Sequence, residues 1–480
     1  MLFNSLQFLV FFPVVTTLYF ILPHRWRWLL LLVASCLFYM AFIPAYILVL
    51  FAVILVDYIA GIHIEKSIGP RRKQYLIMSI LANVGCLVFF KYSNFAIGNI
   101  NSLAGFLHWN YSLPLLKIIL PVGLSFHTFQ AMSYTIEVYR GKHPAERHLG
   151  IYALYVMFFP QLVAGPIERP GHLIPQFREE HRFNYARVAS GLQLMFWGFF
   201  KKLAVADRLA EIVDGMYGNP TQGAGAALFV ITIFFAVQIY CDFSGYVDIA
   251  RGAARVMGFD LSENFNRPYS AKSITEFWRR WHITLYQWFR DYIYIPLGGN
   301  QKGVARTTLN ILIVFTLTGL WHGAKWTFVV WGLIHGFYLI FELITKRARE
   351  RLASYFNLPL LKQAYAAGQT ILTFLAVSFS WIFFRADSLT DAKIIIGKIS
   401  ADLARLGNLE FINFTFSFFI YYFISIGIMV VGEHIRYSRL GRALLAKAPA
   451  WVTWPVYYAV IAWFLWFGYF GKKSFIYFQF

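Results

Sequence analysis

Cysteine and charged residues are both scarce in this sequence of 480 residues. Its three cysteines, Cys36, Cys86 and Cys241, lie in apolar stretches and form neither a C-x-x-C pair nor a metal-binding spacing. This pattern excludes a disulfide framework. Charged residues make up 14% of the chain and apolar residues 59%. A soluble core cannot bury so much apolar surface, so we predict a polytopic membrane protein with the lipid bilayer as its surroundings.

Acidic residues are also few, with 23 against 43 Lys and Arg, which gives a net charge of +20. In a membrane protein such an excess usually marks basic cytoplasmic loops beside anionic headgroups, so we expect no nucleic-acid partner. No long polar linker interrupts the apolar segments, which predicts one integral-membrane domain over residues 1–480. The first 22 residues contain no basic n-region and no small-residue cleavage site. We therefore expect a retained first span rather than a removed signal peptide.

The predicted fold class is all-α, with about eleven hydrophobic segments, of which two or more do not cross the membrane. Expected spans include residues 4–22, 75–91, 224–241, 326–345 and 450–470. Basic loops at 24–28 and 71–73 contrast with a stretch, residues 92–116, without Lys or Arg, after which the chain returns to basic residues at 140–147. Placing the basic loops inside puts the N-terminus outside the cytoplasm, and the same counting places the C-terminal tail, residues 471–480, outside as well.

The middle of the chain is less regular. Residues 150–166 end in FFPQLVAGP, where prolines stop a helix early, so this segment is expected to be re-entrant. The apolar run 224–241 is expected to end at Asp242 with a DFSGY turn. Buried carboxylates from Asp242 to Asp248, and Glu168 likewise, more often brace a broken helix through basic or backbone partners than perform chemistry.

A capping box, Ser273 followed by Glu276, predicts a helix over SITEFWRRWHITLYQWFRDY, residues 273–292. A period of 3.6 places Trp278 and His282 on one face, with the arginines mostly elsewhere. Two interpretations are open: a membrane-surface helix with solvated arginines, or a helix whose arginines face an anionic ligand.

The GLWHGAKW stretch, residues 319–326, places His322 between two apolar runs. The preceding run, residues 307–321, reaches about 22 Å as a helix, less than a hydrocarbon core of about 30 Å. We therefore expect His322 below the membrane surface, where an ionisable side chain is a functional candidate. The alternative is a histidine hydrogen-bonded inside a helix bundle. His335 would point away from His322 on a continuous helix, so we leave it out of the site.

Several stretches together resemble the bacterial alginate-type and peptidoglycan-type branch of the membrane-bound O-acyltransferase family. The matching stretches are FFPQLVAGPIERP at 158–170, DFSGYVDIA at 242–250, the block ENFNRPYS to PLGGN at 263–300, GLWHGAKWTFVVWGLIHG at 319–336 and FIYFQF at 475–480. The resemblance covers essentially the whole chain, and it makes residues 263–336 the candidate catalytic region.

The resemblance implies a horseshoe of helices around a central pore, with re-entrant segments, in the inner membrane of a bacterium. It implies acetyl-CoA as a donor reached from the cytoplasm, and a polysaccharide hydroxyl outside as the final acceptor. It also implies a periplasmic serine-hydrolase-like acetyltransferase as partner. Within the family pattern His322 is the catalytic histidine, and His282 is the second polar position of the site.

Elementary chemistry agrees with these roles. Moving an acetyl group from a thioester to a hydroxyl needs a base near neutral pH, which an imidazole supplies, so His322 is the expected general base. His282 could position the thioester, polarise its carbonyl or orient His322. The sequence contains no metal-ligand spacing of the H-x-x-x-H type and no G-x-S-x-G nucleophile elbow. We therefore expect no metal, and direct transfer within this chain.

Arg279 and Arg280 are the candidates for binding the phosphates of coenzyme A. Trp278 and Trp281 offer flat surfaces nearby, although aromatic lining is common in any membrane protein. Tyr477 in the tail is a candidate acyl carrier, because related acyltransferase systems have a similar aromatic ending. The alternative for Tyr477 is an aromatic anchor at the membrane interface.

Two other classes of function are open. A transporter of an acyl-bearing substrate should contain interrupted helices in two related halves, and no internal repeat is visible. A structural subunit of a polysaccharide export complex needs no catalytic histidine. The resemblance does not choose among alginate, peptidoglycan and other glycans, although the short C-terminal ending slightly favours peptidoglycan.

Overall fold

The computed structural model describes residues 1–356, 358–403, 410–471, 473 and 475–476. Within these residues the regular elements are helices, and one isolated β-bridge pairs Phe265 with Trp281. Seven helices are long and apolar enough to cross a membrane: Tyr46–Lys66, Pro70–Phe106, Gly225–Met257, Gly303–His322, Trp326–Ile344, Pro359–Arg385 and Ala450–Phe467. The all-α polytopic fold is thereby confirmed, although the expected number of about eleven spans is not.

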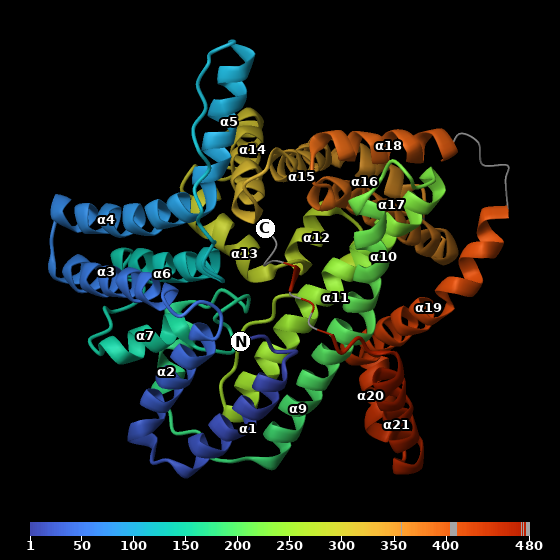
Figure 1. Cartoon of the computed structure of the whole chain (residues 1–480). Coiled ribbons are helices and arrows are strands. Elements are labelled where there is room, and N and C mark those ends of the chain that lie inside the picture. Colours follow the sequence, from blue (N-terminus) through green and yellow to red (C-terminus); the bar gives the residue numbers. More distant parts are fainter. Residues whose placement is uncertain (357, 404–409, 472, 474, 477–480) are drawn as a thin grey trace. The chain divides into compact units, whose positions relative to one another are not determined.

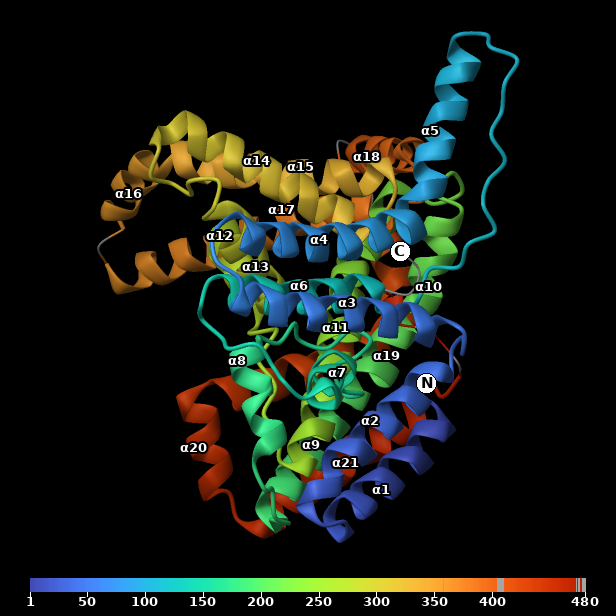
Figure 2. The same ribbon diagram turned by 90° about the vertical axis from the view of Figure 1, so that its left-hand side faces the viewer.

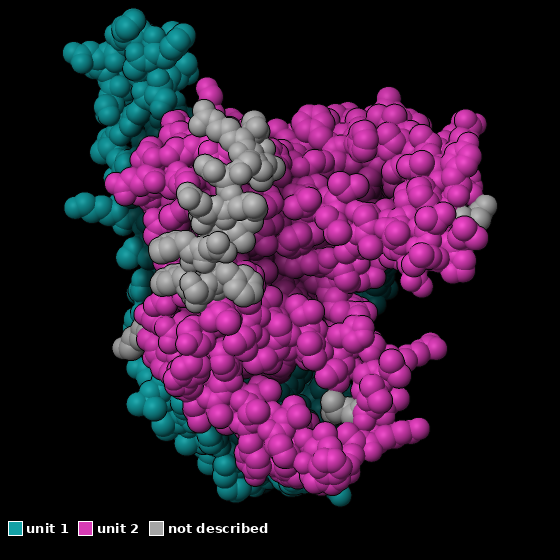
Figure 3. Space-filling model, turned by 90° about the vertical axis from the view of Figure 1, so that its right-hand side faces the viewer, with its two compact units in different colours: residues 1–196, 246–263, 480 teal, residues 197–245, 264–479 magenta. Residues whose placement is uncertain are grey.

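The chain forms two compact units, shown in different colours in Figure 3. The first contains residues 1–196 and 246–263, and the second contains residues 197–245 and 264–479. Helices α9 (Tyr185–Phe199) and α11 (Gly225–Met257) contribute residues to both. Each unit is described separately below.

The first unit is built around a bundle in which α3, α4 and α6 pack against one another, side by side in Figures 1 and 2. Its other helices include α2, which packs on α7, and the short α8. The bounds are α1 Leu6–Ile21, α2 His24–Met40, α3 Tyr46–Lys66, α4 Pro70–Leu87, α5 Ser93–Phe106, α6 Leu124–Tyr139, α7 Leu149–Met157 and α8 Pro170–Leu173. Helix α7 stops before Pro160, as the FFPQLVAGP stretch predicts.

One boundary in this unit differs from the prediction. The span expected to end near residue 91 continues through a π-helical turn, η1 (Val88–Tyr92), directly into α5. Within the first unit Glu168 has the bracing role that its type predicts. Its buried carboxylate accepts hydrogen bonds from the Ser262 amide (2.6 Å), the Ser262 hydroxyl (2.9 Å) and Nδ1 of His172 (2.7 Å).

The second unit contains a close hairpin of α14 and α15, which lie side by side in Figures 1 and 2. The hairpin requires glycine: a Cβ on Gly319 would lie 2.3 Å from the Phe328 carbonyl oxygen, and one on Gly332 would lie 2.2 Å from that of Phe315. The bounds are η3 Phe200–Ala206, α10 Asp207–Gly218, α12 Ile274–Arg280, α13 Ile283–Phe289, α14 Gly303–His322, α15 Trp326–Ile344, α16 Lys346–Ser354, α17 Pro359–Arg385, α18 Leu389–Leu403, α19 Glu410–Tyr437, α20 Arg439–Lys447 and α21 Ala450–Phe467.

The prediction of a DFSGY turn after Asp242 is wrong, because α11, which has 33 residues in all, passes through Asp242 without interruption and ends at Met257. Its polar side chains have partners on the neighbouring helix, so they need no break in the backbone: Asp242 pairs with Lys202 and Ser244 accepts from Lys201. Helix α9 likewise continues without a break, through the π-helical η3 into α10.

Candidate active site

His322 is the last residue of α14, at the helix break that the GLWHGAKW stretch predicts. The helix ends there because Gly323 turns to an extended backbone, φ −163°, and a Cβ at this position would lie 2.1 Å from the Phe328 ring. The apolar run 307–321 is shorter than the helix that contains it, because α14 has 20 residues and is about 30 Å long, enough to cross the hydrocarbon core. A position of His322 below the membrane surface stays a prediction.

The His322 imidazole lies in an aromatic enclosure and is 3% exposed. Its ring centroid is 4.9 Å from that of Trp321, 5.0 Å from Trp331 and 5.3 Å from Phe384. These rings come from α14, α15 and α17, so three helices fix one histidine. An imidazole enclosed in this way is screened from bulk water.

His282 occupies a break that the sequence did not predict. The single helix expected over residues 273–292 is wrong, because α12 ends at Arg280 and α13 begins at Ile283. His282 has φ 44° and ψ 54°, a left-handed conformation that is uncommon outside glycine. The predicted helix start is confirmed, since the Ser273 hydroxyl accepts from the Glu276 amide at 3.1 Å, while the Glu276 carboxylate accepts from the Lys272 amide at 2.7 Å.

The break in this helix results from pairing with a distant segment. The Ile283 amide donates to the Asn264 carbonyl (3.0 Å), the Asn266 amide donates to the Arg280 carbonyl (3.0 Å), and an isolated bridge forms beside them. Residues 264–266 therefore satisfy the backbone groups that a continuous helix would have satisfied itself.

The Asn264 side chain determines which nitrogen of His282 carries the proton. Its Oδ1 accepts from the Thr284 backbone N–H at 3.0 Å, so this atom is an oxygen and an acceptor. His282 Nδ1 lies 3.2 Å from the same oxygen and must therefore be the protonated nitrogen, leaving the lone pair on Nε2. Burial lowers the pKa of His282 to about 3, so the imidazole is neutral at physiological pH.

Trp321 connects the two predicted histidines. Its ring centroid lies 6.0 Å from that of His282 and 4.9 Å from that of His322. Phe243 of α11 closes another side of His282, at 4.8 Å and nearly perpendicular. The structure thus brings together two histidines that are forty residues apart in the sequence.

His335 lies behind this cluster and has both nitrogens engaged. Trp278 Nε1 donates to His335 Nδ1 at 3.2 Å, so the proton of His335 is on Nε2, which donates to the Ser380 hydroxyl at 2.9 Å. A histidine satisfied on both sides is suited to holding α12, α15 and α17 together. Leaving it out of the site agrees with this geometry.

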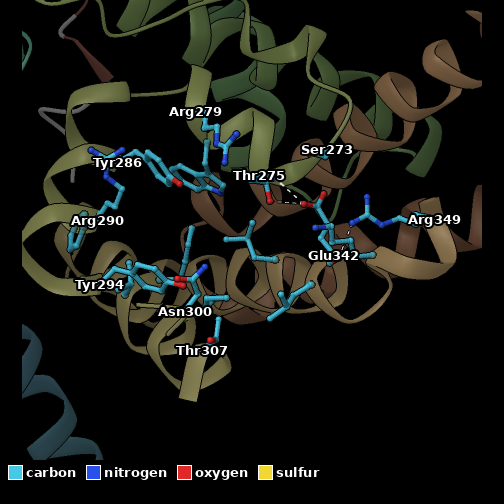
Figure 4. A pocket seen from close by; sticks show the side chains of 18 of the residues that line it. Ser273, Thr275, Arg279, Tyr286, Arg290, Tyr294, Asn300, Thr307, Glu342 and Arg349 are labelled. Carbon is cyan, nitrogen blue, oxygen red and sulfur yellow. Dashed lines mark hydrogen bonds between the residues drawn. The ribbon is translucent and has the colours of Figure 1, made fainter. Parts of the chain in front are cut away.

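A cavity of 740 Å³ lies beside the histidine cluster, within the second unit (Figure 4). Thr318, one helical turn before His322, lines it. Trp278 lines it too, and its ring contacts Trp331 (5.8 Å), which in turn contacts His322 (5.0 Å). The cavity and the histidines therefore share a wall of aromatic rings.

Two of the four residues expected to bind coenzyme A line the cavity, and two do not. Arg279 and Trp278 line the cavity, whereas Arg280 and Trp281 do not. Arg280 pairs with Glu276 at 2.5 Å, and Trp281 is fully buried in the aromatic core. Three further basic residues line the cavity: Arg290, Lys346 and Arg349. Lys346 and Arg349 were not predicted as site residues, because nothing local in the sequence shows that they line the same cavity as α12.

Within the part of the chain that the structure describes, no three His, Cys, Asp or Glu side chains gather as metal ligands. Tyr477, the candidate acyl carrier, lies outside the described residues. The tail is described up to Ile476, whose amide donates to Asp242 Oδ2 at 2.7 Å.

Comparison with known proteins identifies the family. Residues 147–385 match the membrane-bound O-acyltransferase family. A probable alginate O-acetylase of Pseudomonas aeruginosa is 39% identical over 397 residues, which cover 81% of this chain and 73% of that protein. The chain belongs to the membrane-bound O-acyltransferase family. It is therefore a membrane-bound acyltransferase, and the resemblance found in the sequence is confirmed.

Other relatives show how far this similarity extends within the family. A peptidoglycan O-acetyltransferase of Helicobacter pylori is 34% identical over 456 residues, or 86% of this chain and 83% of that one. A teichoic acid D-alanyltransferase of Bacillus subtilis is 26% identical over 223 residues, or 45% of this chain and 56% of that one. The sequence identity to these O-acetylating relatives is thus higher than the identity to this D-alanyltransferase, and it extends over more of the chain.

Proposed function

We propose that this acyltransferase takes acetyl groups from cytoplasmic acetyl-CoA and delivers them to hydroxyls of an extracytoplasmic polysaccharide, peptidoglycan or an alginate-like glycan. The observation that carries the proposal is the pair of buried histidines joined through Trp321, beside a cavity lined by basic residues. The relatives named as O-acetylase and O-acetyltransferase support acetyl as the group transferred.

In the proposed reaction His322 is the general base. It removes the proton of the attacking hydroxyl, whose oxygen forms a bond to the thioester carbonyl carbon. The carbon–sulfur bond then breaks, and the imidazolium returns the proton to the departing coenzyme A thiolate. An imidazole suits both steps because it both accepts and donates a proton near neutral pH.

His282 has a narrower role than the sequence suggested. Its Nε2 carries a lone pair, since the proton is on Nδ1 beside Asn264. A lone pair accepts a hydrogen bond but cannot polarise a carbonyl oxygen. We therefore assign His282 to orienting a hydroxyl or another donor toward His322, and we exclude the carbonyl-polarising role.

The 740 Å³ cavity is the proposed donor site, and its size falls within the usual range for ligand pockets. Arg279 is exposed and makes no ion pair with any residue in the described ranges, so its guanidinium is available to a phosphate. Arg349 adds positive charge from α16, where Lys346 lies 3.9 Å from Glu350, and Tyr286 and Tyr294 provide rings for an adenine. These residues fit coenzyme A, which supplies the activated thioester.

The tail supports a second acceptor within the chain. Phe475 lies 5.5 Å from Phe243, and Phe243 contacts His282 at 4.8 Å. Tyr477 follows Ile476 directly in the sequence. We propose that its phenol receives the acetyl group and passes it to a periplasmic serine-hydrolase-like partner, with both termini outside a bacterial inner membrane.

Purified protein and acetyl-CoA labelled in the acetyl group test the proposal. We expect release of free coenzyme A and labelling of the chain, and we expect Tyr477→Phe to lose the label while it retains the aromatic anchor. A transporter would release no free coenzyme A whatever acceptor is added. Acetylation in cells that is unchanged by Tyr477→Phe would end the carrier role.

A further inference from the structure

The last described residues of the chain are buried although they follow the final helix. Phe475 is 2% exposed and Ile476 is 4% exposed. The end of α21 and the residues that follow it contact α10 and η3 at two earlier points. Arg208 Nε donates to the Phe467 carbonyl (2.6 Å), and the Tyr469 amide donates to the Leu203 carbonyl (2.9 Å).

The third attachment is the contact between the Ile476 amide and Asp242. Oδ2 of Asp242 accepts from the Ile476 N–H at 2.7 Å, while Oδ1 accepts from Lys202 Nζ at 2.6 Å. The same Lys202 Nζ lies 2.9 Å from Asp207 Oδ1. All three charged side chains are nearly inaccessible to solvent. Lys202 thus holds the Asp242 carboxylate in place and leaves one oxygen for the tail.

This arrangement depends on the π-helical turn η3. A π-helical turn inserts an extra residue and is frequent at functional sites. Here it contains Lys201 and Lys202, adjacent in sequence, which both bind side chains of α11. Lys201 donates to the Ser244 hydroxyl at 2.9 Å, and Lys202 binds Asp242. Among the described tail residues, the contact is with Asp242, through the Ile476 amide.

The attachment point adjoins the histidine cluster. Phe243, the neighbour of Asp242, contacts Phe475 of the tail at 5.5 Å and His282 at 4.8 Å. The polar contact and the ring contact therefore come from consecutive residues of α11. They fix both the position and the direction of the tail where it comes nearest to His282 among its described residues.

We propose that Asp242, held by Lys202, is a positioning residue that docks the C-terminal tail beside the histidine pair. The docking stands on the contacts alone, whereas its catalytic importance rests on the proposed function of the tail as acyl acceptor. The charge-assisted hydrogen bond that the buried Asp242 carboxylate accepts from the Ile476 amide favours docking by roughly tenfold or more in the docking equilibrium.

Labelling of a cysteine in the tail measures docking without any reference to activity. Cys36 and Cys86 are replaced by serine, and buried Cys241 is retained. Ile476→Cys is then treated with a maleimide. We expect slow labelling in this background and labelling at least about tenfold faster when Asp242→Ala is added.

The Asp242→Ala variant is well suited to this test, because the buried pair of Lys202 and Asp207 persists in it and no lone charge is left behind. Ser244→Ala is the matched control: it removes the parallel contact between η3 and α11 without touching the tail, so its labelling rate should equal that of the parent. Asp242→Asn keeps the size and one acceptor oxygen, and an intermediate rate is expected. Equal labelling in the parent and in both Asp242 variants would overturn the docking role.

Activity is measured on the same variants. We expect Asp242→Ala to lower acetyl transfer to the acceptor at least about tenfold, with the KM for acetyl-CoA unchanged, because the donor cavity does not include Asp242. Fast labelling together with undiminished acetyl transfer would overturn the positioning role while leaving acyltransfer by His322 intact. If the parent protein releases no coenzyme A, the proposed function is overturned, but the result on docking of the tail is unaffected.

Discussion

The Asn264 side chain gives the sharpest single test of the proposed site. Its Oδ1 accepts from the Thr284 amide (3.0 Å) and the Thr284 hydroxyl (3.0 Å), and it lies 3.2 Å from His282 Nδ1. All three residues are buried. Asn264→Leu removes this acceptor at similar volume. The buried amide and hydroxyl of Thr284 then lose this acceptor, which costs about 1–3 kcal/mol of unfolding free energy.

The same change releases the proton of His282 from Nδ1. His282 can then carry this proton on Nε2 instead. That tautomer lacks the Nε2 lone pair that faces away from Asn264. We therefore expect the rate of coenzyme A release to fall at least about tenfold, beyond what the loss of stability explains. The assay is acetyl-CoA turnover by purified protein, with thermal unfolding measured in a Cys36→Ser, Cys86→Ser background by a thiol-reactive dye that reports exposure of buried Cys241.

Asn264→Asp is the matched control. Within the described residues Asn264 Nδ2 donates no hydrogen bond, so a carboxylate loses no partner there and keeps the acceptor oxygen for Nδ1. We expect this variant to keep much more activity than Asn264→Leu, with a pH profile shifted by the added charge. A leucine variant with the stability and turnover of the parent protein would refute the assignment of the His282 proton.

Three further predictions concern the hairpin, the donor cavity and acid sensitivity. Gly319→Ala should destabilise the protein by about 1–3 kcal/mol in thermal unfolding, because its Cβ would meet the Phe328 carbonyl, whereas Gly397→Ala, in open space, should not. Arg279→Ala should raise the KM for acetyl-CoA about tenfold, while Arg280→Ala, which lies outside the cavity, should leave it nearly unchanged, as steady-state kinetics would show. Because His282 titrates near pH 3 when folded and near 6.5 when unfolded, the unfolded state binds the extra proton between these values, and stability should fall as the pH drops below about 6.5, by roughly 1.4 kcal/mol per unit. Unfolding curves of His282→Asn should lack that part of the acid dependence, and an identical dependence in both proteins would count against a buried neutral imidazole.

The sequence predicted the features that depend on neighbouring residues. The end of α14 at His322 lies where the two apolar runs of the GLWHGAKW stretch meet, and the start of α12 follows from the Ser273 cap. At Ser273 the side chain that shapes the backbone lies within three residues of the amide that it binds. The family and its class of reaction were likewise visible in contiguous motifs, which the comparisons confirm.

The predictions that were wrong concern residues whose contacts lie far away in the sequence. The helix expected through His282 breaks because residues 264–266 pair with it, and nothing within one helical turn indicates this. The turn expected after Asp242 is absent because Lys202, forty residues earlier, neutralises the carboxylate inside a continuous helix. Periodicity places a residue on a face but does not identify what packs there.

The two arginines of the R-R-W-H stretch illustrate the same limit. Arg279 lines the cavity, while its neighbour Arg280 turns back one helical turn to Glu276. Adjacent residues on a helix point about 100° apart, so a motif that names both cannot choose between them. Arg349 reaches the cavity from a different helix, and only the tertiary fold reveals that it belongs to the same basic lining.

Release of coenzyme A by a His322→Gln variant tests the central claim most directly. Glutamine fills much of the same space among Trp321, Trp331 and Phe384 but cannot accept a proton near neutral pH. If His322 is the general base, purified variant protein should remain folded and should cleave acetyl-CoA at least about a hundredfold more slowly than the parent. A folded variant that releases coenzyme A at the parent rate would contradict the claim.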